Sequence, residues 1–124
     1  MSQPTPSDSG TPAAGAWKIN SICLGLLALL LLLVFWPGLN YPFLRDWDDG
    51  NFVMFNSNLA FTLENFRLYA LEPFQDLYTP LPMYSFMLDR ALFGLEPLGF
   101  RLHNLLLHFT AAAFLFLMIR QLGA

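Results

Sequence analysis

Charge is the property that this sequence has least of. Only 12% of its 124 residues are charged, against about 25% in soluble domains, while 56% are hydrophobic. The six basic residues are scattered singly along the chain, and the formal net charge is -3. The chain therefore offers no basic surface for a phosphate backbone, and we predict no nucleic-acid partner.

Cysteine and internal repeats are equally scarce. Cys23 is the single cysteine, and it lies within an apolar run. One cysteine excludes an intrachain disulfide and a cysteine-based metal site within this chain, so cysteine usage does not indicate a compartment. No repeat of about 20–50 residues is visible, and the sequence therefore does not support a solenoid.

Hydrophobic side chains are in excess, with a mean hydropathy of +0.48. A chain with so few charges places this excess against lipid, and we predict an all-α membrane protein. Two transmembrane helices, 17–37 and 101–123, are joined by an extramembrane loop, 38–100, that carries short amphipathic surface helices.

The first predicted span follows a tail, 1–16, whose Pro, Ser, Thr, Gly and Ala content predicts disorder. Every residue of 22–36 is apolar or glycine, and adding 19–21 gives about 18 residues, or roughly 27 Å of helix. A cleaved signal peptide is the alternative, because the run is short and Lys18 precedes it. The segment 37–40 has no small-residue cleavage site, which favours an uncleaved anchor.

The second predicted span is less uniform but long enough to cross a bilayer. Within 109–119 the only polar side chain is Thr110, whose hydroxyl can bond to a carbonyl of the preceding turn. A buried helix of a soluble protein is the alternative interpretation. The remaining polar residues lie near the ends of the span: His103, Asn104, His108 and Arg120.

The loop between the spans is expected to contain two short helices. Thr62 is suited to cap a helix that ends near Leu71, before the sequence Glu72-Pro73. A second helix is expected after Pro80, and Gly94 is placed to end it. One face of this second helix would carry Tyr84, Leu88, Ala91 and Leu92, with Asp89 and Arg90 elsewhere.

The densest polar cluster is the acidic segment, residues 45–51, which contains Asp46, Asp48 and Asp49. A carboxylate here can take a proton from an acceptor hydroxyl, or a pair can hold a divalent cation. The competing interpretation is a solvated turn in which Asp46 or Asp48 caps a short helix. We expect Asp49 rather than Asp48 to be the base, because Gly50 beside it permits close approach of a substrate.

A second polar cluster begins the second span. His103 and His108 are five residues apart, which places them about 140° apart around a helix and makes them a poor metal pair. Asn104 and His108 share a face, and with Arg101 they can contact a ligand head group at the interface. Packing at the membrane surface is the alternative role for these residues.

Several short motifs follow one another between residues 40 and 122. They are Asp48-Asp49, Thr62-Leu63-Glu64-Asn65, Pro80-Leu81, Met87-Leu88-Asp89, Leu92-Phe93-Gly94-Leu95, Pro97, Gly99 and Asn104-Leu105-Leu106-Leu107-His108. Their order resembles the amino-terminal part of multispan glycosyltransferases of the GT-C class. The sequence is most similar to bacterial tetratricopeptide-repeat proteins related to the transmembrane O-mannosyltransferases.

The resemblance implies a transferase whose donor is a sugar on a polyprenyl phosphate. Asp48 and Asp49 match the catalytic first-loop motif of that class. The substrate-binding residues would be Arg101, Asn104 and His108, near the donor phosphate. Metal dependence varies across the class, so neither a metal nor a cofactor is assigned.

The resemblance also implies a place in the cell. The chain would be a multi-pass protein of the bacterial inner membrane, with the loop on the periplasmic side and both termini in the cytoplasm. Charge alone does not orient it, because basic residues flank both sides of the two spans. The expected partners are membrane lipid, the lipid-linked sugar donor and other transmembrane helices.

A function of a different class fits the same sequence. The chain would then be a non-catalytic two-span accessory or assembly subunit that packs against partner spans.

Members of the GT-C class usually continue with many more spans, so we expect this chain to be a segment of a longer enzyme. We also expect the isolated chain to be inactive, since two helices do not enclose a donor site.

Overall fold

The computed structural model describes residues 15–123, which are mostly helical and contain no β-strand. All but the last two residues of the tail predicted at 1–16 lie outside this described part. A five-residue 3-10 helix (Trp36–Asn40) continues the first α-helix, and a π-helical turn (Gly50–Met54) follows the two adjacent aspartates. The four α-helices are α1 (Ala16–Phe35), α2 (Leu63–Leu71), α3 (Pro80–Phe93) and α4 (Pro97–Leu122).

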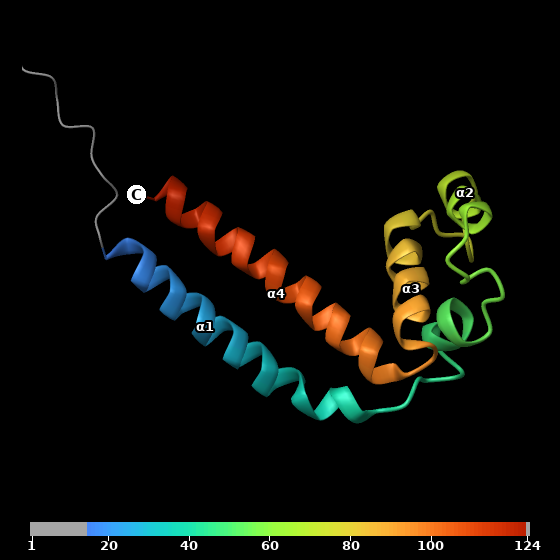
Figure 1. Ribbon diagram of the computed structural model, residues 1–124, viewed down its shortest axis with the longest axis horizontal. Helices are drawn as coiled ribbons and strands as arrows, with labels where there is room; N and C mark the ends of the chain where they lie inside the picture. Colours follow the sequence, from blue (N-terminus) through green and yellow to red (C-terminus); the bar gives the residue numbers. More distant parts are fainter. Residues whose placement is uncertain (1–14, 124) are drawn as a thin grey trace, which may run out of the picture.

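The two long helices, α1 and α4, lie side by side and antiparallel (Figure 1). Near the chain ends of this hairpin, Arg120 Nη1 donates a hydrogen bond to Asn20 Oδ1. Near the other end, the ring of His108 meets the ring of Phe35 edge-on, with centroids 5.8 Å apart. The helices are thus held together near both ends of the hairpin.

Both members of the hairpin have the length and composition to cross a membrane. The segment Trp17–Asn40 has a hydropathy of 2.6 and is 11% buried, and Pro97–Leu122 has a hydropathy of 1.8 and is 6% buried. A core helix of a soluble domain would be mostly buried, so this alternative for the second span is not supported. Thr110 Oγ1 donates to the carbonyl of Leu106 at 2.8 Å, which confirms the bond expected for this hydroxyl.

Residues 41–96, which we call the loop region, build a small core of their own. Tyr69 and Asn56 are both buried there, and the Tyr69 hydroxyl donates to Asn56 Oδ1 at 3.1 Å. Partly buried aromatic rings pack around this centre. The buried apolar members are Val53, Leu59, Tyr69, Met83 and Met87, together with Phe100 from the start of α4.

The helix ends in the loop region agree with the sequence analysis. The Thr62 hydroxyl accepts a hydrogen bond from the backbone N–H of Asn65 at 3.3 Å, which confirms it as the cap of α2. Gly94 ends α3 with a φ of 66°, a conformation that glycine adopts without strain. Gly99 allows α4 to begin close to α3, because a Cβ there would lie 2.2 Å from the ring of Phe93.

The apolar face expected for α3 as a surface helix is not the face that packs on the core. Leu88 and Leu92 of that expected face are exposed, whereas Met83 and Met87 are buried. Asp89, which we placed off the expected apolar face, is fully buried. The apolar pattern of α3 is divided between a face on the core and a face left open, and hydrophobicity alone does not distinguish the two.

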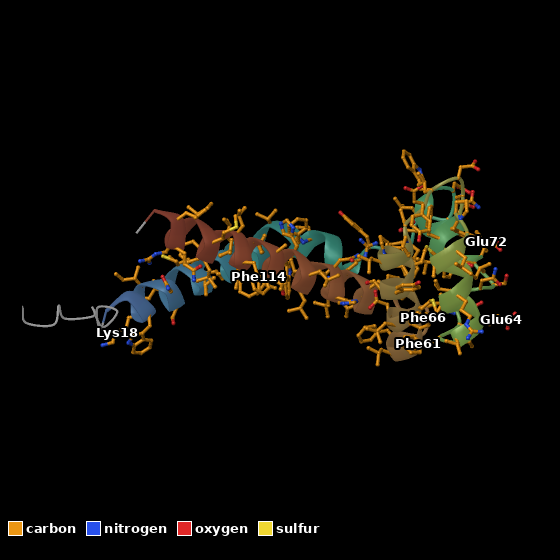
Figure 2. The ribbon with its side chains drawn as sticks, turned by 90° about the horizontal axis from the view of Figure 1, so that it is seen from above. Lys18, Phe61, Glu64, Phe66, Glu72 and Phe114 are labelled. Atoms are coloured by element: carbon orange, nitrogen blue, oxygen red, sulfur yellow. The ribbon has the colours of Figure 1, made fainter. Side chains whose placement is uncertain are left out.

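The loop region sits at the end of the hairpin away from the carboxyl terminus, with α3 steeply inclined to α4 (Figure 1). Figure 2 shows Glu64 and Glu72 of this region at the opposite end of the molecule from Lys18. The acidic, aromatic region and the apolar hairpin meet at the start of α4, where α3 turns into α4. We call this junction the elbow.

Candidate functional site

The acidic segment forms a closed turn rather than an extended loop. Gly50 N–H donates to the carbonyl of Trp47 at 2.9 Å, and Leu44 N–H donates to Asp49 Oδ2 at 3.0 Å. The Asp49 carboxylate thus ties the end of the segment back to its beginning. Asp48 is exposed, and within residues 15–123 its carboxylate makes no hydrogen bond or ion pair with another side chain.

Gly50 has a different role from the one expected. It is buried, and a Cβ at this position would lie 1.9 Å from the carbonyl oxygen of Arg45. The space that glycine leaves free is therefore occupied by the chain's own backbone and not left open for a substrate. The reason for preferring Asp49 over Asp48 as a base does not hold in this structure.

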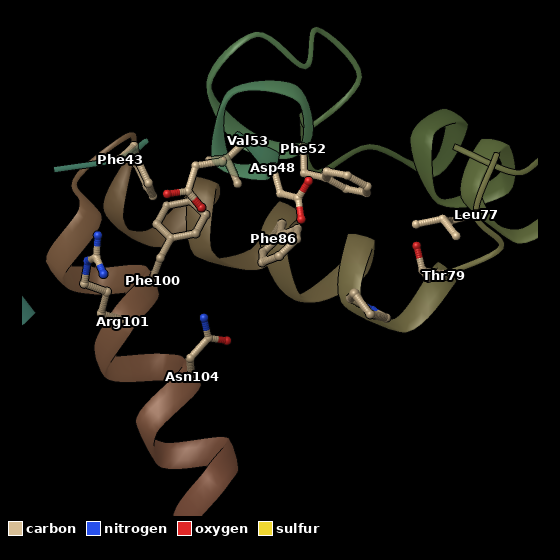
Figure 3. Close-up of a pocket in the computed structure, with 12 residues that line it drawn as sticks. Phe43, Asp48, Phe52, Val53, Leu77, Thr79, Phe86, Phe100, Arg101 and Asn104 are labelled. Carbon is tan, nitrogen blue, oxygen red and sulfur yellow. The ribbon is translucent and has the colours of Figure 1, made fainter. Parts of the chain in front are cut away.

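A cavity of about 300 Å³ lies beside the acidic segment, between the π-helical turn, α3 and the start of α4 (Figure 3). It brings together four of the five predicted site residues: Asp48, Asp49, Arg101 and Asn104. Its other walls are mostly apolar. They are formed by Phe43, Phe52, Val53, Leu77, Thr79, Pro82, Phe86 and Phe100.

Arg101 and Asn104 come from the first two turns of α4 and bound the cavity on one side (Figure 3). Arg101 Nη2 donates to the carbonyl of Pro42 at 3.0 Å, which joins α4 to the chain just before the acidic segment. The Arg101 Nε–H is buried and has no hydrogen-bond partner. A buried donor without a partner lowers stability by about 1–3 kcal/mol. A guanidinium N–H group can donate a charge-assisted hydrogen bond to an anionic ligand.

A second cavity, of about 340 Å³, lies next to the first and shares Arg101 and Asn104 with it. The fifth predicted residue, His108, lines this second cavity. The remaining walls are apolar and come from Phe35, Gly38, Leu39 and Leu105. Together the two cavities form a path from the acidic segment to the junction of α1 with α4.

A third small cavity extends this path between the two long helices. It measures about 200 Å³ and is lined only by aliphatic and aromatic residues, among them Leu31, Leu105 and Phe109. Leu105 lines both this cavity and the second one. The polar end of the path thus lies in the loop region, and its apolar end lies in the hairpin.

Two polar residues at the elbow were not predicted as a pair. Asp89 of α3 and His103 of α4 contact one another through Asp89 Oδ1 and His103 Nδ1. Burial raises the pKa of the Asp89 carboxyl above its ordinary value of 3.8, and the hydrogen bond and charge of His103 oppose this rise. Asp89 Oδ2 has no partner. The only sequence signal was one acid, next to Arg90, in a mostly apolar helix.

No three-residue cluster of His, Cys, Asp or Glu able to hold a metal ion occurs within residues 15–123. His103 pairs with Asp89, while His108 lies against Phe35. The two histidines therefore do not face one another, as the helical wheel predicted. Comparison of the chain with protein-family models, with curated proteins and with solved structures finds no match.

Proposed function

We propose that this chain is the amino-terminal segment of a membrane glycosyltransferase that uses a sugar donor linked to polyprenyl phosphate. One observation carries the proposal: a single cavity joins the loop aspartates to Arg101 and Asn104, and a second cavity toward the hairpin shares these two residues and has otherwise mostly apolar walls. A lipid-linked phosphosugar has the same division, with a polar head and a hydrocarbon tail. The order of motifs in the sequence supports the same class.

The head group of the donor would occupy the first cavity. Its volume of about 300 Å³ falls at the lower end of the 300–1,000 Å³ typical of small-molecule sites. The donor phosphate would lie where the two cavities meet, beside Arg101, whose Nε–H lacks a partner. Guanidinium groups bind phosphate through charge-assisted hydrogen bonds, which fixes the position of the leaving group.

Asp48 is the residue that we assign as general base. The oxygen of an acceptor hydroxyl attacks the anomeric carbon, and the bond from that carbon to the phosphate oxygen breaks. The electron pair of this bond leaves with polyprenyl phosphate, and the Asp48 carboxylate takes the hydroxyl proton. Asp49 holds the turn through Leu44 N–H, so its oxygens are less free for this transfer.

The tail of the donor would follow the apolar cavities toward the seam between α1 and α4. Because both helices are long and apolar enough to cross a bilayer, this seam would lie at membrane depth. We propose the bacterial inner membrane as the location, with the loop region on the periplasmic side. The membrane would keep the tail in lipid while the phosphosugar reaches the aspartates at the interface.

The isolated chain is expected to bind a donor weakly and to transfer no sugar. Both main cavities are open to the outside, and their missing walls would come from further transmembrane helices. Robust sugar transfer by the purified chain in lipid, with no partner present, would contradict this expectation. The alternative function, a non-catalytic accessory subunit, would need no phosphate site at all.

Binding of a polyprenyl phosphate to the chain in lipid nanodiscs tests the proposal. Farnesyl phosphate is a suitable probe, and Arg101→Gln should weaken its binding because the phosphate loses its cation. Arg67→Gln is the matched control, since Arg67 is exposed on α2 and lines neither cavity. No binding by the wild-type chain, or equal loss in both variants, would contradict the proposal.

A further inference from the structure

We propose that Asp89 and His103 act as a positioning pair, which holds the first turns of α4 at the angle to α3 that the donor site requires. The inference rests on the proposed function and adds a role for two residues outside the reacting cavity. It starts from the contact between Asp89 Oδ1 and His103 Nδ1, which joins α3 to α4 across the elbow.

The position of the pair explains why it would matter. His103 directly precedes Asn104 and lies two residues after Arg101, so any rotation of the start of α4 moves both site residues. Pro82 and Phe86 of α3 form another wall of the same cavity. The angle between α3 and α4 therefore sets the width of the cavity between Pro82 and Phe86 on one side and Arg101 and Asn104 on the other.

The composition of the contact also favours a role beyond stability. Asp89 has 0% relative exposure, and its Oδ2 atom has no hydrogen-bond partner. Apolar residues commonly replace such buried ionic groups at no cost to folding, so a buried carboxylate contributes little as a stabilising element. Burial also raises the pKa of this carboxyl, which indicates that the ionised form is disfavoured in the folded chain.

Other charged groups around the pair are occupied elsewhere or exposed. Arg90, next to Asp89 on α3, donates to the carbonyl of Val53, and Arg101 of α4 donates to the carbonyl of Pro42. On α2, which packs against α3, Glu64 and Arg67 are both exposed. On α4, His108 lies against Phe35. Within residues 15–123, His103 is the only side chain within hydrogen-bond distance of the Asp89 carboxyl.

Two spin labels can measure the distance between α3 and α4 across the elbow. Cysteines at Leu81, at the start of α3, and at Phe114, midway along α4, would carry the labels, with Cys23 replaced by serine. Both positions are exposed, at 76% and 70%. Asp89→Leu and His103→Leu should each broaden the distance distribution between the labels, while His103→Asn keeps a donor near the Nδ1 position and should restore it.

Binding of farnesyl phosphate in nanodiscs is the second measurement. Asp89→Leu and His103→Leu should weaken binding about tenfold, because a displacement of about 1 Å in a site is costly. His103→Asn should stay near wild type. Glu96→Gln is the control, since Glu96 is exposed in the turn between α3 and α4 and its side chain makes no capping bond.

Thermal unfolding separates positioning from simple stabilisation. Replacing both residues together, Asp89→Leu with His103→Leu, should keep or raise the unfolding temperature while it broadens the distance distribution at the elbow and weakens binding, because no buried charge is left without its partner. Unchanged distances and unchanged binding in both leucine variants would overturn the positioning role, and so would losses that only follow a lower unfolding temperature. If the wild-type chain binds no farnesyl phosphate, the proposed function fails instead, and unchanged distances then still refute the positioning pair.

Discussion

The hairpin and the loop region are both helical, but they differ in how their side chains are buried and paired. In the hairpin, aliphatic side chains such as Leu33 are largely exposed, at 66%, and few contacts depend on one specific partner. In the loop region, Met87 is 0% exposed, and buried polar groups such as Asn56 are paired individually. The hairpin needs only length and an apolar surface, whereas the loop region needs particular residues at particular places.

This difference locates the chemistry in the molecule. An apolar helix surface offers nothing to hold a proton or a phosphate, so the hairpin contributes only Arg101, Asn104 and His108 at its end. The loop region supplies the carboxylates. The candidate site lies where the two regions meet, and the donor that we propose, with a polar head and an apolar tail, would use both.

The largest expected effect concerns the sides of the membrane from which parts of the chain are accessible. Single cysteines at Ser57, in the loop region, and at Ser7, in the amino-terminal segment, should react with a membrane-impermeant thiol reagent from opposite sides of the membrane. The effect is all or none, because the reagent does not cross lipid. Cys23 is replaced by serine in both variants. Labelling of both positions from the same side would refute the topology.

The next largest effect concerns the acidic segment. In the longer glycosyltransferase that we propose, Asp48→Asn should lower turnover by about 10²–10⁴-fold with nearly unchanged donor binding, because a general base acts in the chemical step. Asp46→Asn is the matched control and should cost far less, since Asp46 lines neither main cavity.

Asp49→Asn tests the division of labour between the two adjacent acids. Its amide oxygen can still accept from Leu44 N–H, so we expect a smaller loss than for Asp48→Asn. Near-normal turnover in both Asp48→Asn and Asp49→Asn would mean that the segment is a solvated turn.

Replacing one large side chain by alanine in each region tests how much the stability of that region depends on close packing. Met87→Ala should lower the free energy of unfolding by about 2–5 kcal/mol, because the cavity left in a buried core does not refill. Leu33→Ala, on the exposed surface of α1, should cost less, since removal of an exposed side chain leaves no buried cavity. Thermal unfolding in detergent, followed by near-ultraviolet circular dichroism, measures the first effect. Equal losses would show that the loop region has no core of its own.

The smallest expected effect is a pH dependence of stability from the elbow. Burial raises the pKa of Asp89 in the folded chain above its ordinary value of 3.8. The folded state therefore holds this proton more tightly, so the contribution of Asp89 to stability is full below 3.8 and is lost as pH rises through the raised pKa.

Asp89→Asn should remove that part of the pH dependence, because asparagine carries no proton to lose. Unfolding temperatures of the wild type and the variant, measured between pH 3.5 and 8, should separate as the pH rises, with the variant the more stable at neutral pH. Parallel curves would contradict the assignment. Glu96→Gln, an exposed acid near the elbow, should leave the wild-type curve unchanged.

Much of the helical framework was predictable because local signals determine it. The two apolar runs, the cap at Thr62 and the end of α3 at Gly94 all act within a few residues of the chain. Four of the five residues named as site candidates line one cavity, and the functional roles of all five stay predictions. The face of α3 was not predictable, because both of its faces carry apolar residues.

The sequence by itself determined two helices of membrane-spanning length and a polar, aromatic segment between them, since composition and local backbone preferences suffice for both. Only the tertiary structure decided that the Arg45 carbonyl occupies the space beside the Gly50 Cα, that Asp49 closes a turn, and that Asp89 contacts His103. These are contacts between residues brought together by packing, and no local pattern in the chain records which partner each side chain meets.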